Sequence, residues 1–304
     1  MTNQTMYLNS HRRANALLVA SFLLALAPIL AQAQVVRSGA GIGGVNVTVA
    51  RDLFRLDLGG GDVGGSNGAF GGLRREINWD GVTAGFSAPN NLPANFFNVN
   101  SPRGAVLSTP GTGFQVSGAI TDVGGGQPAA ANFGHINAQY SSVFSTFSAQ
   151  RLFTPIASNI TDVTFFVAGT TTAGLTNGFG SIFSDVDLAG VSSIEFFDAA
   201  NLSLGSSFVP NVVGATAAHL SFLGVSFATP IISRVRITTG NAVLNANVQD
   251  QNGDRNDLVV MDDFIYGEVV GTVVPEPATL GLLAFGLVAV AIGARRRLAS
   301  RSTV

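Results

Sequence analysis

The chain has 304 residues, a formal charge of −2 and 16 basic residues, all of which are Arg. Charged residues make up 11%, less than half of the ~25% typical of soluble domains, while 46% of residues are hydrophobic, which excludes disorder driven by charge. The absence of Cys excludes disulfide scaffolds and Cys-ligated metal sites, and the absence of an internal Arg cluster argues against nucleic-acid binding.

The N-terminal segment 1–33 is typical of a secretory signal peptide. Two Arg residues form a charged start, and a long apolar run follows them. Pro28 breaks helical structure shortly before Ala31 and Ala33, which form a small-x-small cleavage site and argue against a permanent anchor. We therefore expect export by the Sec machinery and cleavage by signal peptidase, which leaves Gln34 as the first residue.

Near this new N-terminus, Gly39, Gly41 and Gly44 have the spacing of a dinucleotide-binding loop. Such a loop needs a helix after it, whereas the alternating valines of 45–49 predict a strand. We therefore interpret the glycine run as a flexible lead-in and reject a nucleotide site. Further along, the Gly-, Asn- and Pro-rich segment 59–100 predicts a long loop.

The body, segment 34–272, is predicted to be all-β. Apolar and polar residues alternate with a period of two in many short stretches, and no long stretch has helical periodicity. Short strands with close turns and no crossover helices predict an antiparallel β-sandwich, jelly-roll-like in topology. The expected strands cover residues 106–108, 114–117, 143–153, 163–167, 179–187, 193–197, 206–209, 220–227, 231–238 and 258–269.

Glu76 and Asp80 keep a secreted polysaccharide hydrolase open as an alternative. Glycoside hydrolysis needs two carboxyl groups that face one cleft, and these two flank Trp79, whose ring can stack on a sugar. The interpretation we favour is a turn over 78–81 that Trp79 anchors to the core.

A hydrolytic triad has little support in the sequence. The body contains His135 in a polar loop and His219 before an apolar strand, and no G-x-S-x-G elbow surrounds a Ser. A lone His in such a setting is usually a surface or hydrogen-bonded side chain. We therefore expect no catalytic residue.

Segment 245–257 is rich in Asn and Asp, whose oxygen atoms suit Ca²⁺. Asp250, Asn252 and Asp254 fit the first part of an EF-hand loop, but Arg255 replaces the Gly of the sixth position and the Glu of the twelfth position is missing. An EF-hand is therefore not supported. A structural Ca²⁺ site of another kind is one interpretation, and a polar hairpin whose Asx residues cap turns is the other.

Asp262 and Asp263 lie in the expected strand that follows. Adjacent strand residues face opposite sides, so one of the two carboxyl groups is expected to point into the core. A buried carboxylate needs a cation, an Arg or backbone donors, and Arg234 or Arg236 is the alternative to Ca²⁺.

Asp185 and Asp187 share one face of the strand expected at 179–187. They either contribute further oxygen ligands or face water. The predicted metal-ligand set is Asp250, Asn252, Asp254, Asp262 and Asp263.

The C-terminal segment 273–304 contains three elements in order. A Pro-Glu-Pro motif precedes the apolar run 278–294, whose helix would span about 26 Å of a ~30 Å hydrocarbon core, and an Arg cluster follows it. The Arg cluster stays cytoplasmic, so the body lies outside the cytoplasm. An ordinary single-pass anchor is the alternative to a sorting signal. The motif residues are Pro275, Glu276, Pro277, Arg295, Arg296 and Arg297.

These three elements resemble the PEP-CTERM sorting signal of Gram-negative bacteria. The resemblance covers about thirty residues, and it implies recognition of the tail by exosortase, a membrane transpeptidase-like enzyme. Proteins with this signal are typically exported in bacteria that make extracellular polysaccharide and biofilm. The resemblance implies transient insertion in the inner membrane and then a cell-surface or extracellular location, but no activity.

We favour a non-enzymatic cell-surface or matrix protein that associates with extracellular polysaccharide. The body has an excess of acidic over basic residues, which suits a solvated surface or divalent cations. A hydrolase would need paired carboxylates in a cleft with exposed aromatic rings. One Trp and three Tyr offer few rings for sugar stacking.

Overall fold

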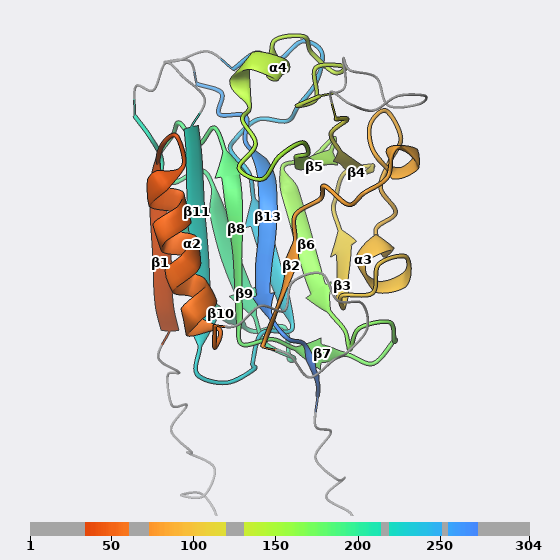
Figure 1. Ribbon diagram of the computed structural model, residues 1–304, viewed down its shortest axis with the longest axis vertical. Helices are drawn as coiled ribbons and strands as arrows, with labels where there is room; N and C mark the ends of the chain where they lie inside the picture. The colour runs from red at the N-terminus through yellow and green to blue at the C-terminus, as the bar shows by residue number, and fades with distance from the viewer. Residues whose placement is uncertain (1–33, 61–72, 120–130, 214–218, 251–254, 273–304) are drawn as a thin grey trace, which may run out of the picture. The chain divides into compact units, whose positions relative to one another are not determined.

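The computed structural model describes residues 34–60, 73–119, 131–213, 219–250 and 255–272. They form two antiparallel sheets and a two-stranded ribbon (Figure 1). In spatial order, the larger sheet contains β1 (Gln34–Ile42), β11 (His219–Phe227), β8 (Gly178–Ser184), β13 (Val260–Gly267), β5 (Phe153–Ile156) and β4 (Gly113–Val116), with β2 (Arg74–Ile77) also paired to β13.

The smaller sheet contains, in spatial order, β10 (Ser203–Phe208), β9 (Ser193–Phe197), β12 (Arg234–Thr238), β6 (Ile160–Phe165) and β3 (Ala105–Ser108). The ribbon pairs β7 (Gly174–Leu175) with β14 (Val270–Gly271). The described helices are α2 (Val45–Asp57), α3 (Phe96–Val99) and α4 (Tyr140–Val143), with a 3-10 turn η1 (Ala84–Phe86).

An apolar core lies between the two sheets. Phe179 and Phe183 on β8 and Val163 and Phe165 on β6 are buried in one continuous cluster to which both sheets contribute. The rings of Phe165 and Phe179 meet across the sheets with their centroids 6.2 Å apart. The prediction of an antiparallel, all-β body is confirmed, while its jelly-roll connectivity stays a prediction.

Helix α2 corrects the strand expected over 45–49. Two of the three valines there are 70% and 57% exposed, so their alternation does not mark a buried face. Val47, Ala50 and Phe54 are buried at helical spacing and cover β1 and β11 on the outer side of the larger sheet (Figure 1). A Cβ at Gly224 of β11 would lie 2.8 Å from the Phe54 ring. Packing against the sheet therefore overrides the strand preference of valine.

The glycine run 39–44 is structured, so the expected flexible lead-in is wrong. Strand β1 pairs antiparallel with β11, and Gly39 lies opposite Phe222. Gly43 and Gly44 then adopt φ values of 76° and 72°, which glycine tolerates without steric cost, and turn the chain into α2. A dinucleotide-binding loop follows a parallel strand of a βαβ unit, and an antiparallel strand does not supply that context.

The strand expected over 143–153 is also wrong, because α4 ends at the start of this stretch and a loop leads to β5. In this loop the N–H of Ser145 donates to the Ser184 hydroxyl at 2.8 Å, and the N–H of Phe147 donates to the Asp262 carboxylate at 2.6 Å. Side chains rather than a neighbouring strand satisfy these backbone donors, so the stretch does not need a sheet partner.

Strand β2 corrects part of the long loop expected over 59–100. It pairs with β13, where Ile77 lies opposite Phe264. Arg75 is fully buried and forms an ion pair with Glu268, with 2.6 Å between Nε and Oε2. This ion pair fixes β2 to the segment that directly follows β13, near the C-terminal end of the body.

The two predicted address segments, 1–33 and 273–304, lie outside the described residues, and so does the apolar run 278–294. Among the residues that the structure describes, no helix is long and apolar enough to cross a membrane. β1 begins at Gln34, directly after the predicted cleavage site.

Candidate functional site

Carboxylates and a histidine gather where β8 ends and β11 begins, at the end of the larger sheet near α4 (Figure 1). Asp185 directly follows β8, and His219 is the first residue of β11. The N–H of Asp185 donates to the carbonyl oxygen of His219 at 3.1 Å, so the pairing of these strands brings the two residues together. We define the acidic cluster as Asp185, Asp187, His219, Asp250 and Asp257.

The acidic cluster consists of two overlapping groups that share Asp187. One group adds Asp185 and His219, and the other adds Asp250 and Asp257. Within each group the candidate ligand atoms all lie within 4.8 Å of one another. Each group is therefore compact enough to surround one cation, whose ligands on opposite sides are about 4–5 Å apart.

Backbone hydrogen bonds hold the cluster's carboxylates in place. The N–H groups of Asp187 and Leu188 each donate to the Asp257 carboxylate at 3.2 Å. The N–H of Leu258 donates to the Asp250 carboxylate at 2.7 Å. The segment before β13 is thereby joined to the segment after β8.

Two carboxyl groups of the cluster, Asp185 and Asp257, have raised pKa values. Burial raises the pKa of Asp185 to about 8, and the nearby carboxylates of Asp250, Asp187 and Asp257 raise it as well. Burial also raises the pKa of Asp257 to about 6. Among the described residues, no Arg forms an ion pair with Asp185 or Asp257. A buried carboxylate without backbone donors or an Arg partner binds either a proton or a cation.

A second pair of carboxyl groups, Asp262 and Asp263, lies on β13. Their exposed fractions are 0% and 6%, so both are buried, whereas the alternation of a regular strand predicts one. The register between β13 and β8 shifts between Met261 and Phe264. This β-bulge redirects the side chains, and it accounts for the failed prediction.

Ser148 connects the two carboxyl groups of this pair. Its Oγ lies 3.0 Å from a carboxylate oxygen of Asp262 and 3.0 Å from one of Asp263. A hydroxyl has one proton to donate, so the pair needs a further proton if both contacts are hydrogen bonds. Burial and the proximity of Asp263 raise the pKa of Asp262 well above its ordinary range, and burial raises the pKa of Asp263.

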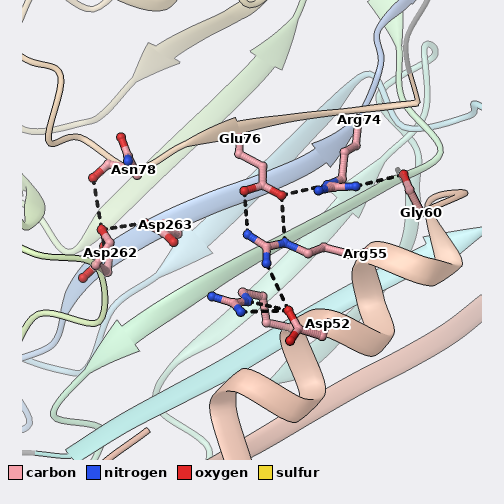
Figure 2. A network of polar contacts seen from close by, with 10 residues as sticks. Asp52, Arg55, Gly60, Arg74, Glu76, Asn78, Asp262 and Asp263 are labelled. Carbon is pink, nitrogen blue, oxygen red and sulfur yellow. Dashed lines mark hydrogen bonds and ion pairs between the residues drawn. The ribbon is translucent and has the colours of Figure 1, made fainter. Parts of the chain in front are cut away.

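Glu76 belongs to an ion-pair network between β2 and α2 (Figure 2). Its two carboxylate oxygens accept hydrogen bonds from Arg55 at 2.8 and 2.7 Å and from Arg74 at 2.7 Å. Burial works against the charged form, but the two guanidinium groups lower the pKa of Glu76 overall. Arg74 also donates to the carbonyl oxygen of Gly60 at 2.8 Å. Glu76 is thus held as a carboxylate.

Trp79 anchors the turn that follows β2, as the interpretation we favoured predicts. Its ring is 1% exposed and stacks on Phe153 at 4.2 Å between centroids. Its Nε1–H donates to the carbonyl oxygen of Asp262 at 2.7 Å. Glu76 and Asp80 flank it in sequence, but Glu76 binds Arg side chains.

A pocket of about 380 Å³ opens beside this turn. Its lining residues include aromatic side chains and side chains that carry amide, hydroxyl and guanidinium groups. Phe86 and Arg103 are half-buried, while Asn78 and Asn100 are exposed. Its lining includes Glu76, Asn78, Trp79, Phe86, Phe96, Phe97, Asn100, Ser101 and Arg103.

The structure separates the predicted metal ligands. Asp250 lies in the acidic cluster, whereas Asp262 and Asp263 contact Ser148 in a group of their own. Asn252 and Asp254 lie outside the described residues, as do the six residues of the sorting motif.

Arg234 and Arg236 do not serve as partners of the β13 carboxyl groups, as one alternative predicted. Both donate to Asp162 on the neighbouring strand β6, at 2.6 Å and 2.8 Å. The side chains of Asp162 and the two Arg thus lie together on the smaller sheet.

Sequence reasoning considered Asp185 and Asp187 but missed His219 as their partner. The sequence predicts a surface or hydrogen-bonded His219. The ring is 1% exposed and its Nε2 contacts the Val186 carbonyl at 3.1 Å, but its Nδ1 makes no hydrogen bond within the described residues. The available signal was its place at the start of a strand, because such a residue pairs with the end of a neighbouring antiparallel strand.

Comparisons with known proteins identify the C-terminal address. Residues 273–297 match the PEP-CTERM protein-sorting motif. No curated protein matches the chain. Among solved structures, the enzymatically active domain of tailspike protein 4 from bacteriophage CBA120 is similar at 14% identity and a TM-score of 0.21. That likeness covers 62% of this chain and 22% of the tailspike chain, and it carries no functional argument.

Proposed function

We propose that this chain, which carries a PEP-CTERM sorting motif and is therefore an exosortase-sorted extracellular protein, is a non-enzymatic surface or matrix protein that binds polysaccharide. The observation that carries the glycan-binding part is the pocket beside Trp79, with its mixed aromatic and polar wall. Its body would act as a glycan-binding sandwich in the extracellular polysaccharide.

The size and the chemistry of the pocket suit a sugar. A volume of about 380 Å³ lies at the lower end of the usual range for small-molecule sites and has room for one or two sugar rings. The half-buried ring of Phe86 offers an apolar surface, while Asn100 and Ser101 offer donors and acceptors for hydroxyl groups.

The carboxylates are poorly arranged for hydrolysis. Glu76 is the pocket's acidic lining residue among those described, and its lowered pKa makes it a poor general acid. The Asp262–Asp263 pair is buried and does not line the pocket, so a substrate has no access to it there. Both points support binding over the alternative, a secreted polysaccharide hydrolase.

The test is binding of the exported chain to short neutral and acidic oligosaccharides and to extracellular polysaccharide. We expect Phe86→Ala and Asn100→Ala each to weaken binding about tenfold, equivalent to about 1.4 kcal/mol. Phe208→Ala is the matched control, because Phe208 is 63% exposed on β10 of the smaller sheet.

Unchanged binding by both pocket variants would exclude the pocket as the glycan site. Release of new reducing ends from the polysaccharide, lost in Glu76→Gln, would establish the hydrolase instead.

A further inference from the structure

We infer that the acidic cluster binds a divalent metal ion, with His219 Nδ1 and the carboxylate of Asp185 as ligands and with Asp187, Asp250 and Asp257 supplying further negative charge. This site is separate from the proposed glycan pocket, which none of these five residues lines. The five residues lie close together, and the buried Nδ1 of His219 has no hydrogen-bond partner among the described residues.

The histidine ring presents a lone pair to the carboxylates. His219 Nε2 lies 3.1 Å from the carbonyl oxygen of Val186, and since a carbonyl only accepts, Nε2 carries a proton. With that proton alone on the ring, Nδ1 has a free lone pair. A hydrogen bond from one ring nitrogen to a backbone carbonyl is the usual way in which proteins orient a metal-binding histidine.

The lone pair of His219 points at negative charge. Nδ1 lies 3.4 Å from Asp185 Oδ1, whereas Asp187 Oδ1 lies 3.8 Å from Nε2, the nitrogen that carries the proton. Nδ1 is buried and makes no hydrogen bond within the described part of the chain. A lone pair that faces a carboxylate oxygen is repelled unless a proton or a metal ion lies between the two atoms, and a metal ion bound by both would remove that repulsion.

The alternative to a metal ion is a proton. Without a cation, a proton between His219 Nδ1 and Asp185 Oδ1, which lie 3.4 Å apart, would serve instead. The two states differ in an observable way, since metal binding displaces that proton. Proton release on binding therefore distinguishes the site from a carboxyl group that is merely neutral.

The ligand atoms favour a metal that accepts both nitrogen and oxygen. Imidazole and carboxylate together suit Mn²⁺ or Zn²⁺, whereas Ca²⁺ takes oxygen ligands. His219 belongs to the group with Asp185 and Asp187, in which one candidate ligand atom from each residue lies within 4.8 Å of the others. We therefore assign the site to a divalent ion of the Mn²⁺ and Zn²⁺ class rather than to Ca²⁺, which was one interpretation of the acidic segment 245–257.

Such an ion would connect three distant parts of the chain. Asp185 and Asp187 follow β8, His219 begins β11, and Asp250 and Asp257 precede β13. These three strands are neighbours in the larger sheet. The ion would therefore stabilise the end of the sheet against local opening, and its effect should appear as thermal stability.

The experiment uses the full chain without a polyhistidine tag, stripped with chelator and then titrated with Mn²⁺, Zn²⁺ or Ca²⁺. At a metal concentration about 100-fold above Kd, we expect Mn²⁺ or Zn²⁺ to raise Tm by roughly 5–10 °C, with proton release in calorimetry. His219→Gln should weaken binding at least about tenfold. Asp198→Asn, in the β9–β10 turn of the other sheet, should bind as the wild type does.

A spectroscopic measurement covers the case in which a variant does not fold. Electron spin-echo spectra of Mn²⁺ bound to the wild-type chain should show coupling to a histidine nitrogen. Absence of a Tm shift with all three ions would overturn the site. A shift with Ca²⁺ alone, or Mn²⁺ binding without nitrogen coupling, would overturn the role of His219. Neither result bears on glycan binding by the pocket, so the two proposals fail independently.

Discussion

The indole N–H of Trp79 donates to the main-chain carbonyl of Asp262 at 2.7 Å, across 183 positions of sequence. This bond fixes the turn after β2 to the bulge of β13. It satisfies a carbonyl where the register shift disturbs the regular ladder between β13 and β8. The same turn forms part of the pocket wall, so the shape of the pocket depends on this contact.

Removing the indole N–H should destabilise the body. Trp79→Phe keeps an aromatic ring beside Phe153 but leaves the Asp262 carbonyl without its donor, at a cost of about 1–3 kcal/mol. Trp79→Ala also removes the stacked ring and should cost about 3–5 kcal/mol. Urea unfolding measures both values. If Trp79→Phe unfolds at the same urea concentration as the wild type, the bond contributes nothing to stability.

The contact between α2 and the larger sheet should depend on Gly224. In Gly224→Ala the new methyl group would lie 2.8 Å from the Phe54 ring, so the helix must shift outward. We expect a loss of about 1–3 kcal/mol, measured by thermal unfolding. Gly81→Ala is the control, since a Cβ there meets nothing within 4 Å. Equal effects of the two substitutions would show that α2 does not pack as closely as described.

The Asp262–Asp263 pair should make the body less stable as pH rises. Burial raises the pKa of both groups above the ordinary value of 3.8, so the folded state holds a proton that the unfolded state releases. Their contribution to stability is therefore fully present below pH 3.8 and is lost as pH rises through the folded pKa values.

Asp262→Asn tests this pH dependence, because the amide can donate to Ser148 without a titrating proton. The fall in Tm as the pH rises above 3.8 should be smaller in the variant than in the wild type. The wild type and the variant are compared in chelator, so that the acidic cluster contributes equally to both. Parallel Tm curves would mean that the pair does not share a proton.

The sequence predicts the fold where one side of a strand is buried. Apolar and polar residues alternate around Val163 in β6 and around Val235 in β12. The alternation arises because each of these strands has one face in the core. The same alternation at 45–49 is misleading, since sheet contacts rather than local preference decide that α2 forms.

The acidic cluster was less accessible from sequence than the fold. The composition around Asp250 indicated a carboxylate-rich site, but its partners lie at the ends of strands distant in sequence. Only the antiparallel pairing of β8 with β11 brings Asp185 to His219. The inward position of both Asp262 and Asp263 depends on a bulge, and bulges have no clear sequence signal.

The processing of the two ends should match the limits of the described body. β1 begins at Gln34 and pairs through its first residue with Phe227, so cleavage after Ala33 would leave the edge strand complete. The PEP-CTERM match begins at residue 273, after β14 ends at Gly271. Removal of the tail beyond the motif would therefore leave the folded body unchanged.

Mass spectrometry of both termini, on protein recovered separately from membranes and from the extracellular fraction, checks this. We expect the extracellular form to start at Gln34 and to lack Arg295–Arg297, and Pro277→Ala to increase the membrane-bound, uncleaved form. An extracellular form that retains the Arg cluster would contradict removal of the tail by exosortase.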